Sequence, residues 1–173
     1  MDDFADREYI SIGCGKVKYD NCVHMDIADN KFTDVDIVGD VRSIPFPEKR
    51  FKGAIFAHVL EHLDKRDHRR ALFEIRRVLQ DDGQVYIEVP DMLKACTFFV
   101  ENFKGRRDYW YQCLYGRNDY SSDSHKSGIT EQYLTDILFD CGFGKLKWLN
   151  LEKDEALIGV FATKLDEVPK GRL

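Results

Sequence analysis

Two glycines and a carboxylate near the start of the chain have the spacing of a nucleotide site. The apolar run Tyr9–Ile12 ends in Gly13-Cys14-Gly15, and a second short run, 22–26, ends in Asp26. In a parallel α/β sheet, the carboxyl ends of the first two strands present such a site. The first glycine permits a tight turn and the second lets backbone approach a ligand closely. Asp26 would then accept hydrogen bonds from ribose hydroxyls.

Three kinds of nucleotide site can follow a Gly-x-Gly turn. A dinucleotide site needs a third glycine, where this chain has Lys18, and an acid about 20 residues further on, whereas Asp26 follows much sooner. A P-loop needs Gly-Lys-Ser/Thr, which is not present after the turn. The third ligand, S-adenosylmethionine, has no phosphates and therefore needs neither feature.

Short apolar runs and amphipathic stretches alternate along the chain and predict its fold. We expect strands at 9–12, 22–26, 34–40, 53–57 and 84–89. We expect helices at 65–80 and 92–103, and another that Thr130 begins and Gly142 ends. A hairpin of 146–151 and 156–163, turning at 153–155, closes the sheet. The predicted fold class is α/β, a doubly wound Rossmann-like sheet that is mostly parallel with a C-terminal antiparallel hairpin.

The regular alternation stops over residues 91–128. This stretch contains the aromatic run 109–111 and then a loop rich in Ser, Asp, His and Lys. A long excursion at the carboxyl ends of the strands is where a substrate lid would lie. The alternative is a helix that packs its rings against the edge of the sheet. We therefore expect 1–173 to form one domain with 91–128 as its lid.

Composition restricts the partners and the compartment. The net charge is −5, which is unlike a non-specific nucleic-acid binder, and no apolar run approaches the roughly 20 residues that span a bilayer. The five cysteines form no Cys-x-x-Cys pair, which favours reduced thiols and a cytoplasmic location. The basic face of helix 65–80 is interpreted as a solvated surface. We expect neither nucleic acid nor membrane as a partner.

A series of short motifs, in order along the chain, resembles the class I methyltransferases. They are Ile12-Gly-Cys-Gly, His24-Met-Asp26, Gly39-Asp40-Val, Ile44-Pro-Phe-Pro, Val59-Leu-Glu61-His62-Leu and Val89-Pro-Asp91. The likeness is greatest to a short subgroup, often linked to cell-surface or glycan biosynthesis, in which the helix after the glycine turn is cut down. It covers nearly the whole chain and implies S-adenosylmethionine as the cofactor.

The resemblance also implies roles for individual residues. Gly13, Cys14 and Gly15 would line the methionine part of the cofactor, and Asp26 with Ile27 would hold its ribose. Asp40 and Val41 would contact the adenine, while Ala57 and His58 would close over the ligand. Val17 stands where the family has a third glycine. Because a helix N-terminus is then lost beside the methionine carboxylate, we expect Lys16 or Arg42 to compensate.

The segment His58-Val-Leu-Glu61-His62 matches the inverted zinc-protease motif His-x-x-Glu-His. On a helix, His58 and His62 would share a face, as a metal pair requires. The same letters occur at this position in methyltransferases, so the sequence predicts no metal site. Glu61 and His62 are expected to bond nearby backbone groups, although one of them could polarise the substrate.

Methyl transfer to oxygen benefits from a general base of nearly neutral pKa, and histidine is the natural choice. His125 lies in the expected lid, His58 lies beside the cofactor, and Glu61 is the third catalytic candidate. A purely structural role for His125 is the alternative.

The sequence therefore predicts an S-adenosylmethionine-dependent methyltransferase. Its acceptor would be a small molecule or a glycan, with O-methylation as the favoured reaction. The alternative is a module that binds the cofactor or its demethylated product without turnover, and a zinc hydrolase is a distant third.

Overall fold

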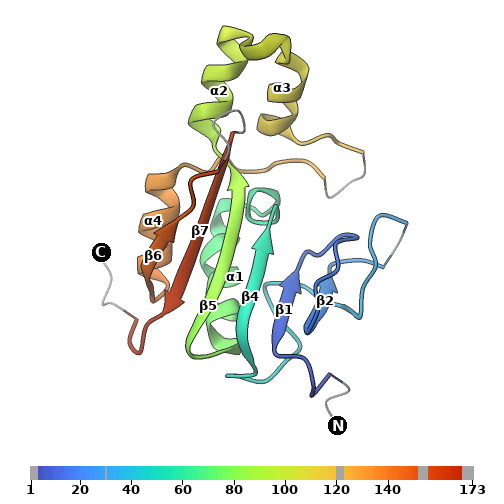
Figure 1. Ribbon diagram of the computed structural model, residues 1–173, viewed down its shortest axis with the longest axis vertical. Helices are drawn as coiled ribbons and strands as arrows, with labels where there is room; N and C mark the ends of the chain where they lie inside the picture. The colour runs from blue at the N-terminus through green and yellow to red at the C-terminus, as the bar shows by residue number, and fades with distance from the viewer. Residues whose placement is uncertain (1–3, 30, 120–122, 152–155, 169–173) are drawn as a thin grey trace.

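The computed structural model describes residues 4–29, 31–119, 123–151 and 156–168, and its centre is a seven-stranded sheet (Figure 1). The strand order is β3-β2-β1-β4-β5-β7-β6. The strands are β1 (Tyr9–Ile12), β2 (Cys22–Asp26), β3 (Ile37–Val38), β4 (Phe51–Ala57), β5 (Leu79–Pro90), β6 (Phe143–Trp148) and β7 (Leu157–Lys164). The α-helices are α1 (His68–Val78), α2 (Met92–Glu101), α3 (Arg107–Tyr115) and α4 (Glu131–Asp140), with single 3₁₀ turns η1 (Leu60–His62), η2 (Lys65–Asp67) and η3 (Phe103–Gly105).

The first five strands are parallel, and the order reverses between β1 and β4. From β1 the chain adds β2 and β3 on one side, then crosses to add β4 and β5 on the other. In such sheets, ligands bind in the crevice outside the carboxyl ends of the strands at this reversal. β7 runs antiparallel between β5 and β6. The predicted fold class is therefore confirmed.

Helices α1 and α4 lie together on one face of the sheet (Figure 1), and their buried side chains join the main core. The α1 residues Leu72 and Ile75 are wholly buried there, as the 3.6-residue period predicts. Thr130 caps α4, because its hydroxyl accepts the backbone N–H of Tyr133. The connection 13–21 between β1 and β2 contains no helix, which agrees with the cut-down first helix expected from the sequence.

The start of β5 was predicted too late, at residue 84, and the helix before it too long. α1 ends at Val78, and Leu79 already pairs with Phe51 in β4. Both side chains are wholly buried, so the sheet outcompetes the helix at this point. The register shifts before Gly53 pairs with Gln84, and Asp82 takes a left-handed φ of +57° there. Asp82-Gly83 thus belongs to a bulge within β5 rather than to the end of a helix.

The other end of the chain shows a similar shift. β6 covers Phe143–Trp148, not 146–151, because Phe143 is wholly buried and pairs with Lys164. β3 is only two residues long where 34–40 was expected. The predicted hairpin turn at 153–155 lies outside the described residues.

The basic face that was predicted to be solvated is exposed at Lys65, Arg66, Arg69 and Arg70, whereas Arg76 and Arg77 are half-buried. Arg76 donates to the carbonyl oxygens of Gly142 and Leu165. Arg77 donates to the carbonyl oxygens of Ile44 and Phe46, and Arg69 pairs with Asp140. These side chains tie α1 to the surrounding loops, so their charges serve the fold.

Helices α2 and α3 project beyond the carboxyl end of the sheet (Figure 1) and have a small core of their own. Trp110 is wholly buried in it, and its indole N–H donates to the carbonyl oxygen of Phe103 at 3.0 Å. Asp91 caps α2 through the backbone N–H of Leu93 and Lys94. The segment leaves and returns at one point, because Asp91 and Ile129 form a parallel bridge.

His68, at the start of α1, is wholly buried and anchors the returning segment. Its Nδ1 lies 2.9 Å from the Tyr133 hydroxyl, and its Nε2 lies 3.0 Å from the Ser127 hydroxyl. Nε2 also lies 3.3 Å from the carbonyl oxygen of Leu63. Burial lowers the pKa of His68 below its ordinary value, since the neutral ring satisfies these contacts without a desolvated charge.

The lowered pKa of His68 makes stability depend on pH. His68 has the higher pKa in the unfolded chain, so the unfolded chain takes up this proton first as the pH falls. The contribution of His68 to stability is therefore full above the unfolded-state pKa and is lost as the pH falls toward the folded-state pKa. Urea unfolding at pH 7.5 and pH 5.5 should show a larger loss of stability for the wild type than for His68→Gln. Equal losses in both proteins would contradict this assignment, because all other titrating groups are shared.

Candidate functional site

The glycine turn that follows β1 folds back on β2. The backbone N–H groups of Gly13 and Cys14 both donate to the carbonyl oxygen of Met25, at 2.8 and 3.2 Å. Gly13 has a φ of +67°, and a Cβ there would lie 2.3 Å from Val59 Cγ2. Gly15 has a φ of +54°, and a Cβ there would meet the Phe32 carbonyl oxygen at an ordinary contact distance of 3.9 Å. Both positions therefore require glycine because of their backbone conformation, and Gly13 requires it for packing as well.

Asp26 ends β2 directly beside this turn. Its Oδ2 accepts the N–H of Gly15 at 3.0 Å, and its Oδ1 accepts the N–H of Ile27 at 2.7 Å. Each carboxylate oxygen keeps a second lone pair. The carboxylate thus braces the turn and can still accept hydrogen bonds from a ligand.

A cavity of about 240 Å³, called cavity 1 here, opens outside the ends of β1, β2 and β4. Seven of the nine residues predicted to bind a cofactor line it: Gly13, Gly15, Asp26, Ile27, Asp40, Val41 and His58. Phe32 and Leu63 add apolar surface to the walls. A carboxylate, exposed turn backbone and apolar walls suit a nucleoside that carries a flat base and no phosphates.

Cys14 and Ala57 are the two predicted residues that do not line cavity 1. The Cys14 thiol points toward the carbonyl oxygens of Gly15 and Asp34, and burial raises its pKa to about 11. Ala57 lies in β4, where successive side chains alternate between the two faces of the sheet. Both residues line a separate hollow of about 750 Å³, cavity 3, which also contacts Gly13 and His58.

Asp40 is held by an arginine that was expected to act elsewhere. Arg42 donates to both Asp40 oxygens and also pairs with Asp67 at 3.1 Å. The guanidinium lowers the pKa of Asp40 and keeps it ionised. Arg42 is thus paired with two carboxylates and also lines cavity 1, so its expected role at the methionine end of the cofactor stays a prediction. Any contact of Asp40 with a base must share the carboxylate with Arg42.

His58 links the cofactor cavity to two carboxylates. It follows β4 with a left-handed φ of +55°, and its Nε2 lies 3.0 Å from Glu88 Oε1. Its Nδ1 lies 3.5 Å from Glu61 Oε1, a distance typical of an ion pair rather than a hydrogen bond. Glu61 first, and then Glu88, raise the pKa of His58.

The inverted metalloprotease motif does not form. His58 lies before the turn η1 and outside any helix, so it does not share a helical face with His62. Instead, the rings of His62 and His125 lie 4.8 Å apart in an edge-on arrangement. His125 donates through Nδ1 to the Cys113 carbonyl oxygen at 3.1 Å, and burial lowers its pKa.

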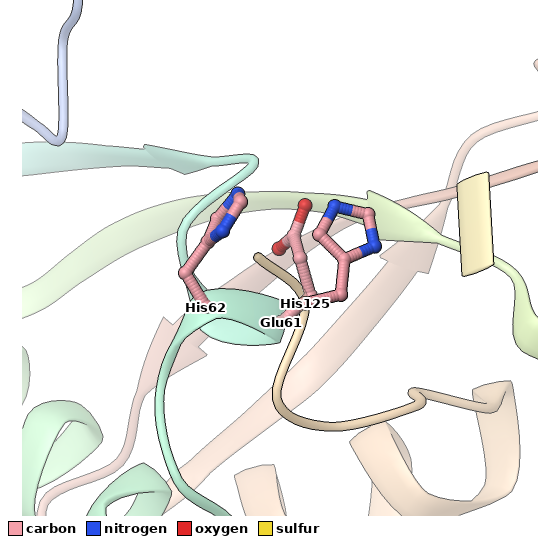
Figure 2. A group of neighbouring side chains, drawn as sticks. All are labelled: Glu61, His62 and His125. Carbon is pink, nitrogen blue, oxygen red and sulfur yellow. The ribbon is translucent and has the colours of Figure 1, made fainter. Parts of the chain in front are cut away.

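The Glu61 side chain was expected to form hydrogen bonds with nearby backbone groups. This expectation was wrong for its carboxylate. The side chain is 2% exposed, and neither oxygen has a hydrogen-bond partner among the residues that the structure describes. Its backbone carbonyl accepts the N–H groups of Lys126 and Ser127. Figure 2 shows the carboxylate and the rings of His62 and His125 turned toward one another.

A third hollow, cavity 2, has a volume of about 240 Å³ and lies between the sheet end and helices α2 and α3. Glu61 and His125 line it at one end, and Lys126 lines both cavity 2 and cavity 1. The remaining walls are largely apolar and include Met92, Cys96, Leu114, Tyr115 and Ile129.

Sequence reasoning missed several residues of cavity 1. Phe32, Thr33, Leu63, Asp67 and Lys126 line it, but none follows a strand end directly. Asp67 and Lys126 reach the cavity only because η2 and the returning segment lie beside it. No local pattern in the sequence signals that proximity.

Comparison with known proteins agrees with this geometry. Residues 10–87 match the family described as Methyltransferase domain. No curated protein matches the chain in sequence. Among the described residues, none of the helices has the length and apolar character needed to cross a membrane.

Several solved structures share the fold. An S-adenosylmethionine-dependent methyltransferase from Methanosarcina mazei is 19% identical, with a TM-score of 0.65 and 94% of each chain covered. One from Archaeoglobus fulgidus is 16% identical, with a TM-score of 0.61, covering 91% of this chain and 86% of that one. One from Thermotoga maritima is 18% identical, with a TM-score of 0.61, covering 91% and 82%. Residues 10–87 are thus similar to the Methyltransferase domain family, and the chain shares the fold of S-adenosylmethionine-dependent methyltransferases.

Proposed function

We propose that the protein methylates an oxygen of a small-molecule or glycan-type acceptor that binds in cavity 2. The observation that carries this proposal is that the two cavities adjoin at Lys126, which lines both. S-adenosylmethionine, when bound, supplies a methyl group on a positively charged sulfonium. Gly13, Gly15, Asp26, Ile27, Asp40 and Val41 would hold it in cavity 1, with Lys126 offering a cation for its carboxylate.

The acceptor side has apolar walls and few polar groups. Glu61 and His125 line cavity 2, and His58 lies 3.5 Å from Glu61, which supports these three residues as candidates for contact with an acceptor hydroxyl. Holding the hydroxyl in line with the methyl group is worth up to roughly 7–11 kcal/mol in well-oriented reactions. The apolar walls favour an acceptor with an apolar body.

Residues 91–128 would act as the lid over this acceptor, within a single domain. Support comes from the adjacent ends of the segment at Asp91 and Ile129 and from the separate core around Trp110. Adjacent ends and a small core apart from the main one are features expected of a lid. The cytoplasmic location expected from the reduced cysteines belongs to the same proposal.

Ligand binding should distinguish the cofactor from a dinucleotide. At about 100 times its dissociation constant, S-adenosylmethionine should stabilise the fold by about 2.7 kcal/mol, which raises the melting temperature by several degrees. NAD should leave the melting temperature unchanged. A shift with NAD and none with S-adenosylmethionine or its demethylated product would refute the cofactor assignment.

The same protein should transfer labelled methyl groups from the cofactor to small molecules in cell extracts. Cys96→Phe, which fills cavity 2, should abolish transfer and leave cofactor affinity unchanged. Val100→Phe is the matched control, because Val100 lies on the same helix and is 75% exposed. Cofactor binding without any transfer of label would favour the alternative, a binding module without turnover.

A further inference from the structure

Three potential ligand groups meet where cavity 2 approaches the cofactor site. Glu61 and His62 come from the turn η1, and His125 comes from the segment that returns from α3. One ligand atom from each residue lies within 4.8 Å of the other two. Figure 2 shows the three side chains converging from these separate parts of the chain.

The two histidines are held with a lone pair available. Nδ1 of His62 lies 3.2 Å from the carbonyl oxygen of Ser124, and Nδ1 of His125 lies 3.1 Å from that of Cys113. A carbonyl oxygen only accepts hydrogen bonds, so each Nδ1 carries the proton and each Nε2 keeps its lone pair. Metal-binding histidines are commonly oriented in this way, by donating the other ring N–H to a backbone carbonyl.

The carboxylate between them lacks a donor. Glu61 is 2% exposed, and within the described part of the chain no group donates a hydrogen bond to either oxygen. His58 lies 3.5 Å from one Glu61 oxygen, an ion pair only when its ring is protonated, and it is also bound to Glu88 at 3.0 Å. A buried carboxylate is costly unless it is paired and hydrogen-bonded or bound to a metal.

We propose that Glu61, His62 and His125 bind a divalent cation of the zinc or manganese class. Two imidazoles and one carboxylate suit these ions, and three protein ligands leave coordination positions open. This set differs from the inverted metalloprotease motif, which would use His58 and His62, and from the sequence-based expectation of no metal. His125 then serves as a ligand, which replaces the general-base role expected from the sequence.

The bound cation would also take part in acceptor binding, and this role rests on the proposed function. Glu61 and His125 line cavity 2, whereas His62 lines cavities 1 and 3. A cation among them would bind an acceptor oxygen at the boundary of the two sites. The acceptor class is therefore a compound with a metal-binding hydroxyl on an apolar body.

Metal titration of the full chain tests the site. After treatment with a chelator, the wild type should bind one equivalent of Zn²⁺ or Mn²⁺ in calorimetry. Glu61→Gln, which keeps the shape and removes the charge, and His125→Ala should each weaken binding about 100-fold or more, since even an outer partner of a metal ligand is worth up to about 100-fold. Glu101→Gln is the matched control, because Glu101 is exposed and lines none of the three cavities, and it should stay within a few-fold of the wild type.

Two results would overturn the proposal. One is the absence of stoichiometric binding by the wild type, and the other is binding that survives Glu61→Gln and His125→Ala. Binding lost in His58→Gln but kept in His125→Ala would overturn it in favour of the inverted motif. Cofactor affinity is measured separately, so a protein that binds metal but not S-adenosylmethionine would refute the proposed function alone.

A second measurement uses the wild-type protein alone, so its result does not depend on whether the variants fold. Substitution with Co²⁺ should produce the visible absorption of histidine-bound cobalt. Acetohydroxamate, a small bidentate oxygen ligand, should change that spectrum by occupying the open positions. A Co²⁺ spectrum without histidine character would overturn the ligand set, and one that acetohydroxamate leaves unchanged would overturn the role in acceptor binding.

Discussion

Replacing Asp26 with alanine is expected to weaken S-adenosylmethionine binding by about 30-fold or more. Two charge-assisted hydrogen bonds to ribose hydroxyls contribute roughly 2–4 kcal/mol together, net of solvation. The same carboxylate also accepts the N–H of Gly15, so its loss should loosen the turn that faces the ligand. Isothermal calorimetry of the wild type and the variant measures the difference.

Asp29→Ala provides the control for charge. Asp29 lies in the connection that follows β2, is exposed, and does not line cavity 1. The variant therefore removes an equal charge without removing a contact with the cofactor. Its cofactor affinity should stay within a few-fold of the wild type. An equal loss in both variants would mean that Asp26 acts only through long-range electrostatics.

Gly13→Ala should have the largest effect on stability among the glycine positions of the site. A left-handed φ costs a non-glycine residue about 1–2 kcal/mol, and forcing an extra methyl into packed atoms costs typically a further 1–3 kcal/mol. The methyl would overlap Val59, which also lines cavity 1. We therefore expect a loss of about 2–5 kcal/mol in chemical unfolding, together with weaker cofactor binding.

Gly105→Ala separates the two causes. Gly105 has nearly the same φ, +65°, but a Cβ there meets no atom within 4 Å. This variant should lose only the backbone part, about 1–2 kcal/mol. Adding Val59→Ala to Gly13→Ala should recover part of the packing loss, as contacting residues are coupled. Equal losses at Gly13 and Gly105 would contradict the steric explanation.

The features that the sequence predicted well are local. A glycine turn after an apolar strand, and an acid at the end of the next strand, depend on neighbouring residues alone. Gly13, Gly15 and Asp26 therefore lie together at the ends of β1 and β2, as expected, and line cavity 1; their contact with a cofactor stays a prediction. The period of apolar residues likewise predicted which face of α1 is buried.

The features that were missed depend on the path of the chain. His62 meets the carbonyl oxygen of Ser124, 62 residues further on, only because the segment after α3 returns to η1. Arg42 pairs with Asp67 because η2 passes close to the end of β3. Leu79 joins the sheet because a buried pair with Phe51 outweighs a helical preference. Each of these features is a tertiary contact, which either overrides the local structural preference or cannot be predicted from it.

The placement of β7 between β5 and β6 has a consequence for the order of events during synthesis. β6 is made before β7, yet its ladder in the sheet is with β7. β5 likewise receives its second neighbour from residues up to 79 positions later, as Gln84 and Thr163 show. The ribosome must therefore release Lys164 before this edge of the sheet can close. Until then, β7 is not available to cover the apolar faces of β5 and α4. During this interval the nascent chain is most exposed to misassociation.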